Sequence, residues 1–382
     1  MRKLGWATFS RRRGAGGLCG VLVFAPVFVL ASAAGGERLS RAEMGMPPSG
    51  SPGAETTSQA SVEFNPRLLR RFSPVRPVMA SDPSRVTDDL VTLGRLLFFD
   101  ERLSRNQKLS CNSCHGLERY GVDGERTSVG HKGQRGGRNA PTVYNAAAYA
   151  VQFWDGRAAD IESQAMGPIL NPVEMAMPSA GAVEKVLRSI PGYLEPFKRA
   201  FPGEAQPITF ANTTRAIGAF ERRLSTPSRW DRYLTGQKDA LTVAEKEGLR
   251  LFTNLGCMVC HTGETLGGTA YQRVGAVEQW PNQKDQGRFE VTKLEADRMM
   301  FKVPTLRNIE KTAPYFHDGS GATLSDAVKA MGRYQLGLDL SADEVTSIVT
   351  WLKSLTGELP RAYIAAPLLP KSGRETPRPD PN

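Results

Sequence analysis

The sequence predicts a mainly α-helical protein built from two similar units, and three observations carry that prediction. Apolar residues recur at helical spacing in several segments, separated by long Gly- and Pro-rich loops with little strand pattern. A short motif occurs twice, Gly-Arg-Leu-Leu-Phe at 94–98 and Gly-Leu-Arg-Leu-Phe at 248–252. Each copy is followed by a cysteine motif. A chain of 382 residues is long enough for two domains of ordinary size.

The apolar periodicity predicts four principal helices. The last of them has clear ends, because Ser341 and Glu344 form a capping-box pattern and Gly357 follows the final apolar residue. The expected helices cover residues 85–99, 208–224, 241–252 and 342–355.

Composition and charge indicate a soluble globular protein without a nucleic-acid partner. Hydrophobic residues make up 40% and charged residues 23% of the chain. The net charge is +10, but residues 1–34 contain five basic residues and no acid, so half of that excess lies in this segment. The basic balance therefore does not indicate a polyanion-binding surface.

Residues 1–34 have the layout of a signal peptide. A basic segment leads into an apolar run at 18–31, and the small residues 32–34 suit cleavage. The run is shorter than the ~20 residues of a membrane span and contains Pro26. An uncleaved anchor is the alternative. We expect export to the periplasm and no stable membrane span.

The composition of residues 35–382 indicates two domains between a linker and a tail. Residues 35–80 and 367–382 are rich in small residues and proline without periodicity, which predicts a flexible linker and a disordered tail. Between them we expect an N-terminal domain at 81–235 and a C-terminal domain at 236–366.

Four of the five cysteines lie in two Cys-x-x-Cys-His motifs, at 111–115 and 257–261. This spacing is the attachment signature of haem c, in which two thiols bind the vinyl groups and the histidine binds iron. A zinc site or disulfides are the alternatives, and neither explains the histidines. The pattern predicts two cytochrome c-like domains, each with one covalently attached haem c. The attaching and ligating residues are Cys111, Cys114, His115, Cys257, Cys260 and His261.

Only His131 and His317 remain as further histidines. A methionine as the second axial ligand raises the reduction potential of a haem, which suits an electron acceptor. A haem that reacts with a substrate needs a sixth position that is open or can be opened.

Several long segments resemble the bacterial dihaem cytochrome c peroxidases, a family related to the MauG-type dihaem enzymes. The resemblance covers about residues 85–358, and the segments that carry it are 93–100, 136–142, 153–157, 301–308 and 313–319. It implies reduction of hydrogen peroxide to water, electrons from a monohaem cytochrome c or a cupredoxin, and a homodimer.

The resemblance also implies unequal haems. The N-terminal haem corresponds to the peroxidatic, low-potential haem, and the C-terminal haem to the high-potential haem where electrons enter. In the family the second haem's distal ligand is a methionine 14 residues after the histidine that corresponds to His317, which gives Met331. His131, in a Gly-rich loop, matches the ligand that caps the peroxidatic iron and leaves when the other haem is reduced.

Cleaving the O–O bond requires a group that moves a proton between the two oxygens. The segment at 161–177 offers two candidate carboxylates, Glu162 and Glu174. Glu174 lies between apolar residues in a loop stiffened by proline, which favours a raised pKa of its carboxyl group. The family's acid–base glutamate aligns with Glu174 and its pocket glutamine with Gln164. Trp154 matches the tryptophan between the haems.

The resemblance further implies a calcium ion between the domains. Its protein ligands would be Asn139 and the backbone carbonyls of Thr312 and Pro314, with waters completing an oxygen-only set. No acidic cluster in the sequence points to this site.

Two other functions remain open on the sequence. A MauG-like enzyme would oxidise a protein partner, and that enzyme has a tyrosine at the position of Met331. A non-enzymatic dihaem electron carrier would need neither a displaceable ligand nor a carboxylate in a pocket.

Overall fold

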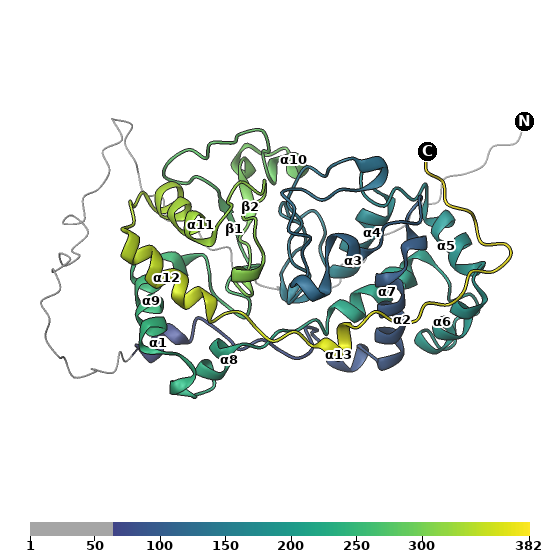
Figure 1. Cartoon of the computed structure of the whole chain (residues 1–382), viewed down its shortest axis with the longest axis horizontal. Coiled ribbons are helices and arrows are strands. Elements are labelled where there is room, and N and C mark those ends of the chain that lie inside the picture. Colours follow the sequence, from purple (N-terminus) through teal and green to yellow (C-terminus); the bar gives the residue numbers. More distant parts are fainter. Residues whose placement is uncertain (1–63) are drawn as a thin grey trace, which may run out of the picture. The chain divides into compact units, whose positions relative to one another are not determined.

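The computed structural model describes residues 64–382 as helices joined by long loops, with one small sheet (Figure 1). The α-helices are α1 (Pro66–Leu69), α2 (Asp88–Phe99), α3 (Cys111–Cys114), α4 (Ile161–Leu170), α5 (Ala180–Arg188), α6 (Leu194–Ala200), α7 (Phe210–Glu221), α8 (Arg229–Leu234), α9 (Val243–Asn254), α10 (Phe289–Thr292), α11 (Leu324–Ala330), α12 (Ala342–Lys353) and α13 (Arg361–Ile364). Strands β1 (Tyr271–Arg273) and β2 (Met300–Lys302) pair antiparallel. The prediction of a mainly helical protein is confirmed.

Short helical turns occupy many of the loops. The 3₁₀ turns are η1 (Pro83–Arg85), η2 (Glu101–Leu103), η3 (Leu117–Arg119), η4 (His131–Gly133), η5 (Ala146–Ala148), η6 (Pro191–Tyr193), η7 (Lys238–Ala240), η8 (Cys257–Val259), η9 (Glu295–Asp297) and η10 (Ile309–Lys311). One turn, η11 (Met331–Leu336), is π-helical. No helix formed by residues 64–382 is long and apolar enough to cross a membrane. The predicted signal peptide lies outside the described residues.

The four predicted helices are present as α2, α7, α9 and α12, with ends that differ by a few residues. The predicted capping box of α12 is also present. The Ser341 hydroxyl accepts a hydrogen bond from the Glu344 backbone N–H at 3.3 Å, and the Glu344 carboxylate accepts one from the Ser341 N–H at 2.9 Å.

The repeated motif marks two closely packed helix pairs. A Cβ atom on Gly94 of α2 would lie 1.8 Å from the Ala216 carbonyl oxygen of α7. A Cβ atom on Gly248 of α9 would lie 2.0 Å from the Ser347 carbonyl oxygen of α12. Only glycine allows the backbones to approach this closely. A glycine therefore lets the helix that precedes each cysteine motif, α2 or α9, pack closely against its partner helix, α7 or α12.

The buried apolar residues form two main clusters around these helix pairs. The first surrounds α2 and α7 and includes the fully buried Leu93 and Phe220. The second surrounds α9 and α12 and includes Trp230 and Trp351, whose rings meet edge to face at 5.7 Å between centroids. Each cysteine motif is thus supported by its own apolar core.

Residues 64–80 differ from the predicted flexible linker. The Phe72 side chain is 5% exposed, and its ring packs edge-on against Trp230. The backbone N–H of Val75 donates to Asp231 at 2.7 Å. A few apolar residues spaced through a Pro- and Ser-rich segment bury enough surface to order it. Residues 35–63 of the expected linker lie outside the described residues.

The C-terminal segment 367–382 differs from the predicted disordered tail. It runs in an extended path beside the N-terminal half (Figure 1, yellow). Its backbone carbonyls accept hydrogen bonds, from Arg102 to Pro370 at 2.8 Å and from Gln107 to Pro377 at 2.7 Å. Arg105 and Asp380 form an ion pair at 2.6 Å. Polar partners on the folded half hold a segment that has no periodicity of its own.

Candidate functional site

The C-terminal cysteine motif follows α9, where Gly256 adopts a positive φ of 93° and turns the chain into η8. Cys257 and Cys260 are free thiols and not a disulfide. Nδ1 of His261 lies 3.0 Å from the Leu266 carbonyl oxygen. Because a carbonyl only accepts, Nδ1 carries the proton and Nε2 keeps its lone pair for a metal. Burial lowers the pKa of His261, which favours this neutral, ligating form.

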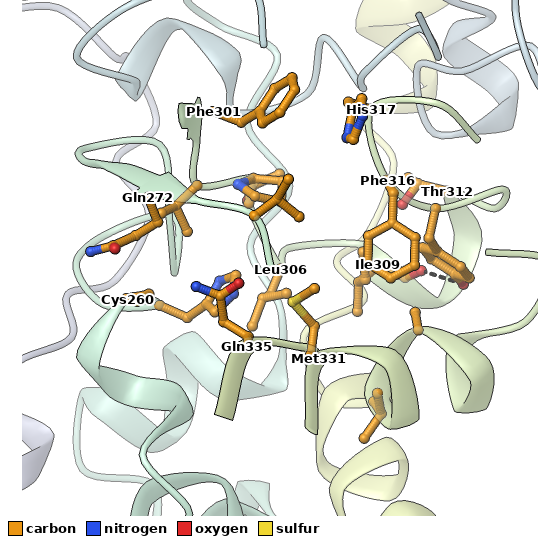
Figure 2. Close-up of a pocket in the computed structure, with 18 of the residues that line it drawn as sticks. Cys260, Gln272, Phe301, Leu306, Ile309, Thr312, Phe316, His317, Met331 and Gln335 are labelled. Atoms are coloured by element: carbon orange, nitrogen blue, oxygen red, sulfur yellow. Dashed lines mark hydrogen bonds between the residues drawn. The ribbon is translucent and has the colours of Figure 1, made fainter. Parts of the chain in front are cut away.

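This motif opens onto a mainly apolar cavity of about 220 Å³. The lining combines apolar side chains, including Phe252, Leu306 and Leu352, with Cys257, Cys260, His261 and Met331. Met331 begins the π-turn η11 and extends into the cavity (Figure 2). An apolar pocket with two thiols, an imidazole and a thioether fits a covalently attached porphyrin whose iron is bound by histidine and methionine.

The N-terminal motif has the same local chemistry. Cys111 and Cys114 bound the single turn α3, whose capping box uses Ser110. Nδ1 of His115 lies 3.3 Å from the Gly121 carbonyl oxygen, and burial lowers the pKa of His115. Both motif histidines are therefore held by a backbone carbonyl and left with one ring nitrogen for iron.

His131 is a buried imidazole with no hydrogen-bond partner. It is 3% exposed, and neither Nδ1 nor Nε2 makes a hydrogen bond within residues 64–382. Burying an unpaired polar group is costly. An orphaned imidazole suits a missing metal bond, so this residue fits the haem implied by the N-terminal motif.

Glu174 lies directly against the His131 loop. Its backbone carbonyl accepts a hydrogen bond from the His131 backbone N–H at 2.8 Å. A Cβ atom on Gly130 would lie 2.0 Å from the Val173 carbonyl oxygen, so glycine permits the close contact of the two loops. The structure thus brings together two predicted site residues that are distant in sequence.

The side chain of Glu174 is suited to proton transfer. Burial raises the pKa of its carboxyl group, against opposing effects of Asn171 and the positive charge of Arg157. Nδ2 of Asn171 donates to Oε1 at 2.7 Å and fixes the aim of the carboxyl group.

The alternative carboxylate, Glu162 on α4, is engaged in an ion pair. Arg222 binds both of its oxygens, with Nε to Oε1 at 3.0 Å and Nη2 to Oε2 at 2.8 Å. Gln164 lies half-buried on the same helix, and its side chain makes no hydrogen bond with that of Glu174. The geometry favours Glu174 over Glu162 as the proton-transferring group.

Asn171 is a site residue that the sequence analysis missed. Its Oδ1 accepts from the Val173 N–H at 3.0 Å while its Nδ2 binds Glu174. The Asn-Pro pair at 171–172 is a turn signal, and an asparagine at such a turn often bonds to the backbone two residues on. The Asn-Pro signal predicts the turn but not the hydrogen bond from Asn171 to the Glu174 carboxylate.

Trp154 joins the two halves of the described chain. Its Nε1 donates to the Asn139 carbonyl oxygen at 2.9 Å, and its own carbonyl accepts from the Lys302 N–H at 2.7 Å. Its ring lies 6.4 Å from that of His317, which stacks on Phe301 at 4.1 Å (Figure 2 shows the latter pair). The tryptophan therefore lies where residues of both halves meet.

Asn139, Thr312 and Pro314 line the same cavity as Met331. The Asn139 backbone N–H donates to the His317 carbonyl oxygen at 2.8 Å, and its Nδ2 donates to the Glu125 carbonyl oxygen at 3.0 Å. The Asn139 Oδ1 accepts no hydrogen bond from the described residues. Within residues 64–382, no group of three His, Cys, Asp or Glu side chains is placed to hold a metal ion.

Two helix-supported Cys-x-x-Cys-His motifs with ligation-ready histidines define a c-type cytochrome with two haems. The sequence model described as di-haem cytochrome c peroxidase matches residues 88–239. The chain is 48% identical over 316 residues to cytochrome c551 peroxidase of Nitrosomonas europaea, which covers 82% of this chain and 92% of that one. It is 46% identical over 327 residues to the Pseudomonas aeruginosa protein of the same name, covering 84% and 91%.

A solved structure, that of a MauG-like protein associated with microbial copper homeostasis, aligns with a TM-score of 0.68 at 30% identity. The alignment covers 74% of this chain and 93% of that one. The chain belongs to the dihaem cytochrome c peroxidase family. The resemblance found in the sequence is confirmed, and the family implies two haems and peroxidase activity.

Proposed function

We propose that the protein reduces hydrogen peroxide to water in the periplasm, with electrons from a monohaem cytochrome c or a cupredoxin. When bound, the two haems supply the redox chemistry, one accepting single electrons and the other reacting with peroxide. The observation that carries this proposal is the buried His131 imidazole, whose ring nitrogens have no hydrogen-bond partner among residues 64–382, beside Glu174. The raised pKa of Glu174 suits proton transfer.

The C-terminal site supports a permanently six-coordinate iron. His261 is fixed by the Leu266 carbonyl and Met331 extends into the same cavity. A nitrogen ligand with a sulfur ligand raises the potential of a haem. These residues therefore suit electron entry and leave no position for peroxide.

At the N-terminal site, His115 is the fixed ligand and His131 the displaceable one. Lys132 and Gly133 both have positive φ, of 58° and 73°, within the loop that carries His131. We propose that this loop has a second arrangement, so that reduction at one site shifts the population at the other. When the haem is bound, His131 would hold its iron in one arrangement and would move away from it in the other.

Glu174 then acts as the acid–base group. Its carboxylate takes the proton from the inner peroxide oxygen and returns it to the departing oxygen. Asn171 holds the carboxyl group in position, and Gln164 contributes a hydrogen bond to the substrate from α4. Trp154 lies on the electron path between the halves.

We propose calcium at the boundary lined by Asn139, Thr312 and Pro314. An amide oxygen without a donor and two backbone carbonyls are suitable ligands for calcium, which accepts oxygen ligands and waters. Removing calcium with a chelator is expected to lower turnover, and adding calcium, but not magnesium, to restore it. Unchanged turnover in protein shown by elemental analysis to be free of calcium contradicts this assignment.

The test of the proposed function is a turnover assay on the half-reduced holoprotein. With hydrogen peroxide present, we expect it to oxidise reduced cytochrome c or cupredoxin in a ratio of two electrons per peroxide. A dihaem electron carrier would not consume peroxide. A MauG-like enzyme would oxidise a protein partner instead, but Met331 occupies the position of that enzyme's tyrosine. Light scattering of the same sample tests the expected homodimer.

A further inference from the structure

Lys302 is a buried cation that the proposed mechanism does not use. It ends β2, is 5% exposed and lines the same cavity as Cys260 and Met331. Among residues 64–382, no carboxylate lies within 4.0 Å of its Nζ. The Lys302 Nζ lies over the ring of Tyr149, 4.0 Å from its centroid. The part of the chain that the structure describes therefore leaves this ammonium group without a counter-charge.

The position of Lys302 is fixed by its backbone. Its N–H donates to the Trp154 carbonyl oxygen at 2.7 Å, and it lies opposite Tyr271 in the sheet. A surface lysine reaches water by extending its flexible stem, but this one is enclosed. Burial lowers the pKa of Lys302 to about 7. Burying an ammonium group without an acidic partner costs free energy, so we expect a negatively charged group to bind beside Lys302.

When bound, the C-terminal haem would supply acidic groups that could serve as this partner. The thioether bonds anchor one edge of the porphyrin at Cys257 and Cys260, and the two propionate carboxylates project from the opposite edge. Phe301, next to Lys302 in the chain, lies at the end of the cavity opposite Cys260 (Figure 2). A haem attached at Cys257 and Cys260 would therefore direct its propionates away from these cysteines, within the cavity that Lys302 also lines.

We propose that Lys302 binds a propionate of the C-terminal haem and keeps a positive charge beside it. This inference rests on the proposed two-haem function and adds a residue to it. A fixed cation near the ring opposes the loss of an electron, so it raises the reduction potential of that haem. Lys302 thus helps Met331 to make the C-terminal haem the electron acceptor.

The test is a spectroelectrochemical titration of the holoprotein and two variants. Lys302→Met removes the charge and keeps the apolar stem. We expect at least a tenfold lower ratio of reduced to oxidised C-terminal haem at a fixed potential, a fall of about 59 mV for one electron. Lys302→Arg should stay near the wild-type ratio. Lys353→Met, an exposed lysine on α12 of the same half, should not change it.

An unchanged potential in Lys302→Met overturns the inference, and peroxide turnover by the wild type in the same preparation shows that the proposed function still holds. A wild type with a single haem or no turnover overturns the function itself. If Lys302→Met does not load its haem, Lys302→Gln takes its place. A similar fall in the reduction potential of Lys302→Gln supports the ion pair between Lys302 and the propionate. A wild-type potential in this variant overturns it.

Discussion

Replacing Glu174 with glutamine is expected to lower peroxide turnover by about 10²–10⁴-fold, the usual contribution of a positioned acid–base group. Glutamine preserves the shape of the side chain and can still contact Asn171, so both haem spectra should be unchanged. Stopped-flow oxidation of the electron donor measures the loss. The result would locate the effect in proton transfer and not in haem binding.

The pH dependence of the wild type gives a second readout. Because burial raises the pKa of Glu174, its carboxyl group ionises at a higher pH than that of an exposed glutamate. The general base must be ionised in the free enzyme, so kcat/KM should rise as the pH increases through this pKa. The rise should be missing in Glu174→Gln.

Glu162→Gln distinguishes the two carboxylates near α4. Both oxygens of Glu162 are bound by Arg222, so this variant should lose far less turnover than Glu174→Gln. Glu195→Gln, on the exposed face of α6, serves as a surface control. A large loss in Glu162→Gln together with normal turnover in Glu174→Gln would show that the acid–base assignment is wrong.

Replacing Asp231 with alanine is expected to lower the free energy of unfolding by about 3–5 kcal/mol, because it leaves a buried arginine unpaired. Arg307 has no exposed side-chain surface and donates to both Asp231 oxygens, at 2.8 and 2.9 Å. The carboxylate also accepts from the N–H groups of Val75 and Ser228, at 2.7 Å each. Asp231 thus ties α8, residue 75 and the cavity-lining segment around 307 together.

The sign of the pH effect follows from the same contacts. Burial alone would raise the pKa of Asp231, but the hydrogen bonds and charge of Arg307 outweigh it and hold this pKa below its usual value. The stabilisation is therefore present above the unfolded-state pKa and is lost as the pH falls through the folded one. Urea denaturation at neutral pH should show the full difference between the wild type and Asp231→Ala.

Asp239→Ala is the matched control, since Asp239 is exposed on the turn that follows α8. Its free energy of unfolding should lie within about 0.5 kcal/mol of the wild type. If Asp231→Ala is as stable as this control, the network does not hold residues 64–80 on the C-terminal half.

The helices were predictable because apolar periodicity and capping are local signals. The repeated glycine of 94–98 and 248–252 pointed to two similar units, and its role in close helix packing required the partners Ala216 and Ser347. The contacts made by the segments at 64–80 and 367–382 could not be predicted from composition, for one reason. Composition averages over a window, whereas Phe72 and Asp380 act as single contacts with distant residues.

The candidate site likewise contains features that the sequence predicts locally and features that depend on distant contacts. The two Cys-x-x-Cys-His motifs are local in sequence and were predictable in full. The orphaned burial of His131, its contact with Glu174 and the unpaired charge of Lys302 depend on long-range packing. No periodicity or spacing in the chain encodes them directly.

The central claim is that the two irons have unequal ligands, one permanently held by His261 and Met331 and the other able to lose His131. An electron paramagnetic resonance titration of the holoprotein, reduced by one electron at a time, tests it most directly. We expect the first electron to enter the C-terminal haem and a high-spin ferric signal then to appear at the N-terminal haem. Two low-spin, six-coordinate irons at every stage of reduction would contradict it.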